Sequence, residues 1–140
     1  GDIKIRPGEV ISGTEGALRF QLPVNSEAAT GTDVTVLTKD GHWEESNDAG
    51  VPTITSGAGT GATIEGNDNL ILLTFGTGAG TAVVLTFAVA YTNAPAAFPN
   101  YGASNIAVWC TTTTTTVTIN FASAPANGAV LHLWIRGWQT

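Results

Sequence analysis

The chain is poor in charge, and this shortage bears on how its surface is covered. Only 11% of its 140 residues are charged, less than half the usual share in a soluble globular domain. Hydrophobic residues make up 43%, enough for a core. So weakly charged a surface is either covered by Thr, Ser, Asn and Gly or buried against other copies, because such chains tend to associate. Association with identical chains is therefore one expectation.

Basic residues are especially few, and long apolar runs are missing. Five Lys and Arg stand against eleven Asp and Glu, a net charge of −6, without any basic cluster. A nucleic-acid partner is therefore not expected. No apolar run approaches the ~20 residues that cross a bilayer, so membrane insertion is not expected either. The chain has no Met and starts at Gly1, which predicts a fragment or a cleavage product.

Cysteine is nearly absent, which excludes an intramolecular disulfide. Cys110 is the single cysteine and follows Trp109 in an apolar stretch. We interpret it as a small buried hydrophobe rather than a nucleophile or metal ligand. If the chain works outside cells, something else must stabilise it, and oligomerisation is the obvious candidate.

Helical periodicity is also missing, whereas period-two alternation runs through the carboxy-terminal half. We expect long strands at 82–91, 113–121 and 129–137. In the first, bulky side chains fall on one face and small ones on the other; the bulky row is Val83, Leu85, Phe87, Val89 and Tyr91. In the last, Leu131, Leu133 and Ile135 share a face that suits a core.

Shorter strands are predicted elsewhere, separated by Gly-rich turns. Residues 70–73 are apolar on both faces, which predicts a strand covered on both sides. We expect a loop from 92 to 102, a short strand at 106–110, and a strand edge or tight turn in the six threonines from Thr111 to Thr116. The architecture is therefore predicted as all-β, a β-sandwich or jelly-roll of roughly eight to ten short strands.

The first 50 residues differ in character, since they carry all charges except Glu65, Asp68 and Arg136. Short strands are expected at 16–20 and 33–38, with a loop at 24–32 and a hairpin turn at Asp40-Gly41. We predict a β-hairpin neck over 1–50 and a β-sandwich head over 51–140.

Catalytic chemistry finds no support. Glu44, Glu45 and Asp48 lie near His42, but adjacent carboxylates on an extended strand point to opposite sides, which favours a solvated turn over a metal or acid–base site. Asp68 is predicted to accept hydrogen bonds from nearby backbone amides, as turn aspartates do. No nucleophile elbow is present. We predict no catalytic residue, metal or cofactor.

The second face of the last strand needs a partner, because it presents His132, Trp134 and Arg136, followed by Trp138. This row could line an oligomer interface, where Trp and Arg are enriched. It could instead be an open ligand platform, since sugar rings pack on aromatic faces. It could also pack against the amino-terminal segment near Trp43. We favour an interface or internal packing over an open platform.

Several motifs follow one another in the second part of the chain: Pro52-Thr53-Ile54-Thr55-Ser56-Gly57-Ala58-Gly59-Thr60, Ile64-Glu65-Gly66-Asn67-Asp68, Phe75-Gly76-Thr77-Gly78, Leu85-Thr86-Phe87, Ala90-Tyr91-Thr92-Asn93-Ala94-Pro95 and Trp134-Ile135-Arg136-Gly137. In this order they resemble the carboxy-terminal head domain of tailed-bacteriophage tail fibre proteins. The resemblance covers 51–140. Residues 16–20 and 39–43 resemble the small "strand, strand, Asp-Gly-x-Trp" modules found along such fibres, although the insertion at 24–32 departs from that pattern.

The resemblance implies a homotrimeric, non-catalytic virion protein that acts outside the host cell. Its partner would be a host cell-surface glycan, or alternatively an outer-membrane protein. The candidate ligand-binding residues are Asn100, Tyr101, Trp109, His132, Trp134 and Arg136. A second hypothesis is a structural virion decoration or fibre-assembly domain without receptor binding. A third, a glycan depolymerase appendage, has no acid pair to support it.

Overall fold

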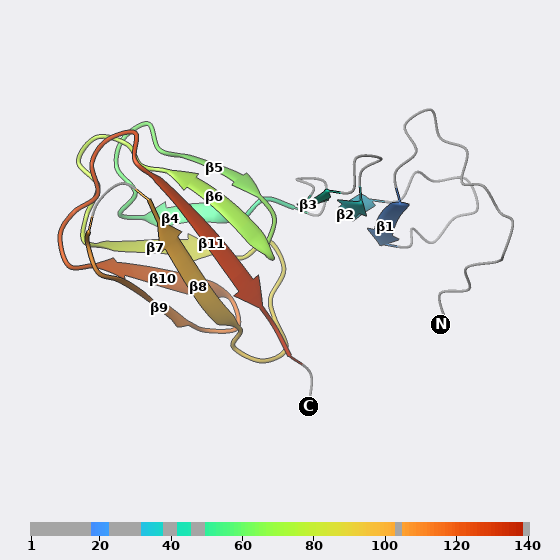
Figure 1. Ribbon diagram of the computed structural model, residues 1–140. Coiled ribbons are helices and arrows are strands. Elements are labelled where there is room, and N and C mark those ends of the chain that lie inside the picture. The colour runs from blue at the N-terminus through green and yellow to red at the C-terminus, as the bar shows by residue number, and fades with distance from the viewer. Residues whose placement is uncertain (1–17, 23–31, 38–41, 46–49, 103–104, 139–140) are drawn as a thin grey trace, which may run out of the picture.

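The computed structural model describes residues 18–22, 32–37, 42–45, 50–102 and 105–138. Within these ranges every regular element is a strand, and the strands form three antiparallel sheets (Figure 1). The all-β prediction is therefore confirmed. Strands fit these segments because Thr, Val, Ile and aromatic residues suit a pleated surface.

The amino-terminal sheet contains β1 (Leu18–Leu22), β2 (Thr32–Leu37) and β3 (Trp43–Glu45), in the order β1-β2-β3. The strands predicted at 16–20 and 33–38 are present with small shifts of their ends. The predicted loop at 24–32 and turn at Asp40-Gly41 lie almost wholly outside the described residues.

Two four-stranded sheets follow. One has the order β4-β7-β10-β9 and comprises β4 (Thr53–Ser56), β7 (Ala82–Thr86), β10 (Thr116–Phe121) and β9 (Val108–Thr112). The other has the order β5-β6-β11-β8 and comprises β5 (Thr63–Gly66), β6 (Leu70–Thr74), β11 (Val130–Arg136) and β8 (Ala96–Tyr101).

Side chains of both four-stranded sheets form one hydrophobic core. The sheet centred on β11 contributes Ile71, Leu73, Leu131, Leu133 and Ile135, all fully buried. The other four-stranded sheet contributes residues from β7 and β10, namely Val83, Leu85, Val117, Ile119 and Phe121. Each such side chain stabilises the fold by about 1.5–3 kcal/mol relative to exposure. The core therefore fixes which face of each strand remains for other uses.

The strand expected over 82–91 is wrong in its second half. β7 ends at Thr86, and Val89, predicted on the bulky face, is 66% exposed. The cause is a contact distant in sequence: the Asp68 carboxylate accepts hydrogen bonds from the backbone amides of Ala88 (2.9 Å) and Val89 (2.8 Å). These amides are thereby directed to a side chain rather than to a neighbouring strand.

The loop expected from 92 to 102 is also wrong, because residues 96–101 form β8. Pro99 has no N–H to donate, so proline is confined to sheet edges and bulges. β8 is the edge strand of its sheet, where this loss is tolerated.

The threonine run behaves as predicted. Thr111 and Thr112 end β9, Thr116 begins β10, and the residues between them form a tight turn. There, the Thr113 hydroxyl accepts hydrogen bonds from the amides of Thr115 (3.2 Å) and Thr116 (3.0 Å). The strand expected from 113 therefore starts three residues later.

Candidate functional site

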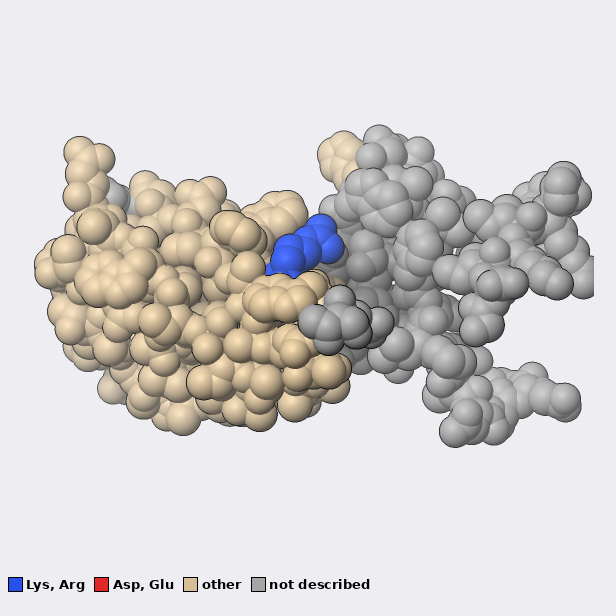
Figure 2. All heavy atoms as spheres, turned by 90° about the horizontal axis from the view of Figure 1, so that it is seen from below, with Lys and Arg blue, Asp and Glu red and all other residues tan. Residues whose placement is uncertain are grey.

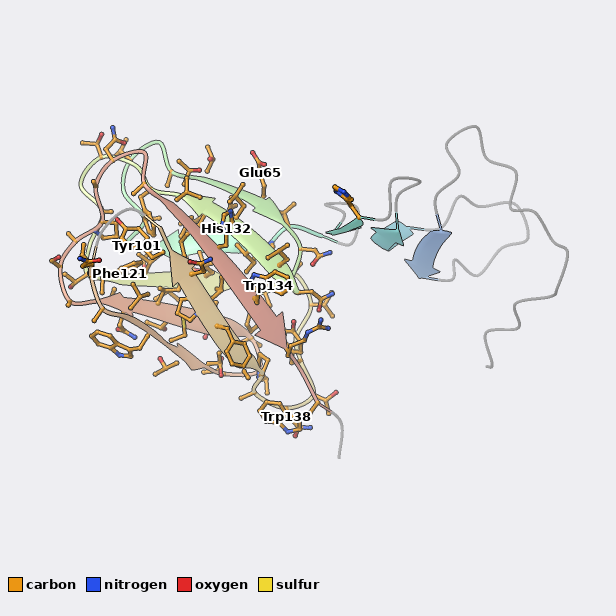
Figure 3. The ribbon with its side chains drawn as sticks, viewed as in Figure 1. Glu65, Tyr101, Phe121, His132, Trp134 and Trp138 are labelled. Atoms are coloured by element: carbon orange, nitrogen blue, oxygen red, sulfur yellow. The ribbon has the colours of Figure 1, made fainter. Side chains whose placement is uncertain are left out.

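The two faces of β11 separate as the alternation predicts. Leu131, Leu133 and Ile135 are fully buried, whereas His132, Trp134 and Arg136 are exposed. The three exposed side chains of β11 thus lie on the face of the sheet that points away from the core. Figure 3 shows two of them, His132 and Trp134, spaced along β11.

Neighbouring strands extend this row into a surface. Trp134 pairs with Leu70 on β6 and with Phe98 on β8. Directly paired residues have Cβ atoms about 4.5–5.5 Å apart, so these three side chains are close neighbours. Trp134 is 51% exposed and Phe98 is 58% exposed. We call the surface formed by Leu70, Leu72, Phe98 and Trp134 the aromatic face.

Polar groups flank the aromatic face. His132 pairs with Leu72 on one side and with Asn100 on the other, and Arg136 pairs with Ala96. Of the residues predicted for ligand binding, the structure therefore brings Asn100, His132, Trp134 and Arg136 onto one face.

Leu70 and Leu72 were predicted to lie in a strand covered on both sides. Ile71 and Leu73 are buried in the core, whereas Leu70 and Leu72 are only half-buried on the outer side. Within the described residues, the outer side of β6 is thus covered only in part.

Phe98 was missed in the sequence because its strand was interpreted as a loop. A signal was available: Phe98 and Asn100 alternate with Ala97, Pro99 and Tyr101 at period two. Proline also occurs on edge strands, so Pro99 does not exclude this strand.

Tyr101 lies on the core side of β8, away from the row. Its ring makes edge contacts with Phe75 (6.1 Å between centroids) and Phe121 (5.5 Å), the latter visible beside it in Figure 3. Such contacts are typical of core packing. Tyr101 therefore does not share a surface with Trp134.

Trp109 is exposed on the opposite side of the molecule. It pairs with Asn120 on the outer face of the other four-stranded sheet. That face is rich in threonine, including Thr111 and Thr118, and the hydroxyls of Thr55 and Thr86 lie 2.6 Å apart. One ligand in one chain cannot contact both Trp109 and Trp134, because the core separates them.

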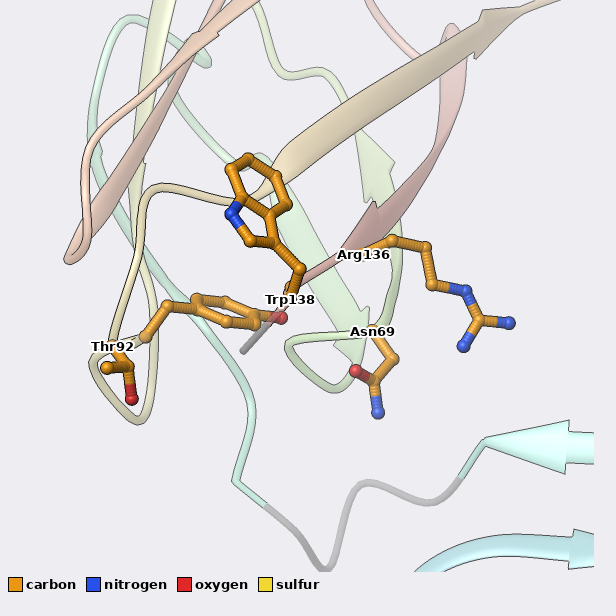
Figure 4. A pocket seen from close by; sticks show the side chains of 6 residues that line it. Asn69, Thr92, Arg136 and Trp138 are labelled. Atoms are coloured by element: carbon orange, nitrogen blue, oxygen red, sulfur yellow. The ribbon is translucent and has the colours of Figure 1, made fainter. Parts of the chain in front are cut away.

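A second feature lies where β11 ends. A pocket of about 320 Å³ is lined by Asn69, Tyr91, Thr92, Arg136, Gly137 and Trp138 (Figure 4). These residues come from the β5–β6 turn, the loop after β7 and the end of β11. We call it the Arg136–Trp138 pocket.

Tyr91 fixes the back of this pocket. Its hydroxyl donates a hydrogen bond to the Asp68 carbonyl oxygen (2.7 Å), and its ring meets Phe87 edge-on at 4.9 Å. Burial, and secondarily the Asp68 carboxylate, raises the pKa of Tyr91 from 10.0 to about 12, while Arg136 acts in the opposite direction. Tyr91 is therefore a neutral, structural phenol at physiological pH.

The Asp68 carboxylate accepts hydrogen bonds from residues that are farther away in the sequence than predicted. Aspartate–amide bonding was expected within its own turn, but the carboxylate bonds amides 20 and 21 residues away. The local role belongs to Asn67, whose side-chain oxygen accepts from the amides of Asn69 (2.8 Å) and Leu70 (3.4 Å).

The described residues include a few reactive side chains, namely Cys110, His42 and His132. No cluster of three or more His, Cys, Asp or Glu that could hold a metal occurs among the described residues. Cys110 is partly buried against the core, and burial raises the pKa of its thiol from 9.0 to about 11, which disfavours the nucleophilic thiolate. His42 is exposed, and the side chains of Glu44, Glu45 and Asp48 lie outside what is described.

In the described part of the chain, no helix is long and apolar enough to span a membrane. No family model matches the chain, and no curated protein and no solved structure matches it either.

Proposed function

We propose that this chain is the non-catalytic tip of a tailed-phage tail fibre, which trimerises and binds a receptor on the bacterial host surface. In this proposal residues 51–140 form a β-sandwich head, residues 1–50 form a neck, and the protein acts outside the host cell as part of the virion. The observation that carries the proposal is the aromatic face, a surface with two half-exposed aromatic rings on a rigid strand framework.

The aromatic face supports association between copies. Leu70 and Leu72 already lie on it half-buried, and Phe98 and Trp134 each expose more than half of their area. Contiguous exposed apolar surfaces mark interaction sites. A closed threefold ring uses two different patches on each subunit, so the aromatic face would meet a different surface of its neighbour.

Receptor recognition would use polar groups at the borders of that interface. His132 and Asn100 are exposed neighbours at one border, and Arg136 lies at the other. A glycan suits such groups because its hydroxyls need hydrogen-bond partners while its C–H faces pack on aromatic rings. An outer-membrane protein is the alternative receptor. Trimerisation would add avidity on a surface with repeated epitopes.

The rival function is a virion decoration or fibre-assembly domain without receptor binding. What favours it is that the aromatic face alone could be fully buried between subunits, leaving no ring for a ligand. The two functions differ in host binding, not in oligomeric state.

A cell-binding assay tests the proposal. The fluorescently labelled full chain is incubated with a panel of bacterial strains, and binding is competed with surface polysaccharide purified from any strain that binds. Saturable, competed binding supports the receptor-binding tip. A stable trimer that binds no strain and blocks no phage adsorption would leave the structural rival as the better account.

A further inference from the structure

The Arg136–Trp138 pocket is lined by three kinds of polar or aromatic side chain: a cation, an indole and an amide. Arg136 and Trp138 line it from the end of β11 and Asn69 lines it from the β5–β6 turn, and their side chains point in different directions (Figure 4). Thr92 adds a hydroxyl. Its volume of about 320 Å³ is at the small end of ligand sites. A single sugar ring is an occupant of the right scale.

The backbone around the pocket is held by contacts that do not use these side chains. The Asn69 carbonyl oxygen accepts from the amide of Ile135 (2.9 Å), and the Trp138 carbonyl oxygen accepts from the Asn93 side chain (3.2 Å). Gly137 lies against the Tyr91 ring, where a Cβ atom would come within 2.7 Å of that ring. The backbone that carries the pocket is therefore held in place before a ligand binds, and such preorganisation lowers the entropic cost of binding.

Arg136 carries a positive charge that the described residues do not neutralise by an ion pair. Asp68 and Arg136 both act electrostatically on Tyr91, and each carboxylate oxygen of Asp68 accepts a backbone amide. Among the described residues on the face that Figure 2 shows, the blue of Lys and Arg is seen at one place, beside tan surface. An anionic group from a ligand would fill this position.

We propose that the Arg136–Trp138 pocket binds an acidic pyranose, a sugar ring that carries a carboxylate, as one residue of an anionic surface polysaccharide. This rests on the proposed receptor-binding function and names its ligand class. The planar guanidinium of Arg136 matches a carboxylate through two parallel N–H···O bonds. The indole of Trp138, 52% exposed, packs on the C–H face of the ring. Asn69 and Thr92 hydrogen-bond the sugar hydroxyls.

The test is a titration of the ¹⁵N-labelled full chain with sodium glucuronate, followed by NMR. The indole N–H resonance of Trp138 is expected to shift saturably, and that of Trp109 to stay in place. Glucuronamide is the neutral isostere and glucose 6-phosphate the phosphate analogue. Glucuronamide is expected to bind ~10-fold or more weakly, because a charge-assisted hydrogen bond is about twice as strong as a neutral one.

Matched variants locate the site. Arg136→Gln and Trp138→Ala are each expected to lower glucuronate affinity by ~10-fold or more. Trp109→Ala removes an indole of nearly equal exposure, 51%, from the opposite sheet and is expected to leave affinity unchanged. Thr92→Val, which keeps the shape of the side chain, provides a second, milder probe of the pocket and is expected to weaken binding less.

Three results would overturn the inference: glucuronamide binding as well as glucuronate, Arg136→Gln binding as well as the parent, or Trp109→Ala losing binding. Tighter binding of glucose 6-phosphate would replace the carboxylate with a phosphate and overturn the ligand class. If the chain binds cells but does not respond to glucuronate, the proposed ligand of the pocket is wrong and the receptor-binding function stands. If it binds glucuronate but no cells, the receptor-binding function is wrong and the pocket ligand stands.

Discussion

The Asp68 carbonyl oxygen accepts the hydroxyl hydrogen of Tyr91 at 2.7 Å, while the Asp68 carboxylate accepts the amides of the two residues that follow Phe87. One aspartate thus connects the β5–β6 turn to the loop after β7. That loop carries Tyr91 and Thr92 into the Arg136–Trp138 pocket. The shape of the pocket therefore depends on a residue that does not line it.

Asp68→Asn tests this connection. The amide has a single oxygen acceptor and turns an N–H₂ group toward one of the two backbone amides. We expect a loss of about 1.5–3 kcal/mol in the free energy of unfolding, the range for hydrogen bonds to charged groups. Urea denaturation measures it. Glu65→Gln on the exposed side of β5 is the matched control and is expected to change stability by less than about 0.5 kcal/mol. Equal stability of the two variants would contradict the connection.

Gly137→Ala tests how closely the chain passes Tyr91. The added Cβ would lie 2.7 Å from the Tyr91 ring, so either the ring or the end of β11 must move. We expect destabilisation by about 1–3 kcal/mol, the usual cost of overpacking, together with weaker glucuronate binding. At Gly102 a Cβ would meet nothing within 4 Å. Gly102→Ala is therefore expected to be neutral or slightly stabilising, and a similar loss at both sites would refute the steric argument.

The loss of stability at alkaline pH tests the raised pKa of the Tyr91 phenol. Its folded pKa, about 12, lies above the ordinary value of 10.0, so the native state holds the phenol proton more tightly than the unfolded state. The stabilising contribution is complete below pH 10 and is lost as pH rises toward 12. The urea midpoint should fall over this range in the parent and fall less in Tyr91→Phe.

Cys110 requires a separate control in that experiment, because its thiol contributes in the same direction between pH 9 and about 11. Cys110→Ala removes the contribution of the thiol to the pH dependence of stability and leaves the contribution of Tyr91. Identical pH profiles for the Tyr91→Phe variant and the parent, both carrying Cys110→Ala, would be incompatible with a buried, hydrogen-bonded phenol.

The aromatic face can be tested with a pair of tryptophans of equal exposure. Trp134→Ser on β11 is expected to weaken association by ~30-fold or more, because centrally placed interface tryptophans often account for 2 kcal/mol or more of binding. Trp109→Ser on the threonine-rich face should not change it. Sedimentation velocity over a concentration series measures both. Association that survives Trp134→Ser and Phe98→Ser together would place the interface elsewhere.

Much of the fold was predictable where a strand has one buried face. The alternation of Leu131, Leu133 and Ile135 with His132, Trp134 and Arg136 identified both faces of β11 correctly, because one face is packed in the core. The threonine run was interpreted correctly for a related reason: β-branched residues suit strand ends, and their hydroxyls can close a turn.

The errors came from interactions that link residues distant in sequence. Nothing near Val89 indicates that Asp68 will bind its amide and end β7 early. Around Pro99 the period-two alternation is a local signal, but only the pairing with β11 shows that this segment is an edge strand, where a missing N–H is tolerated. The pocket was not predictable for the same reason, since Asn69, Thr92 and Trp138 meet only after both loops have folded.

The solution mass of the full chain, measured by multi-angle light scattering at several concentrations, tests most directly the proposed trimer on which the account depends. The account predicts a particle of three 14.3-kDa chains, and conversion to smaller species in Trp134→Ser. A monomer at all concentrations would contradict it, because the aromatic face would then remain exposed and the trimeric tip would not form.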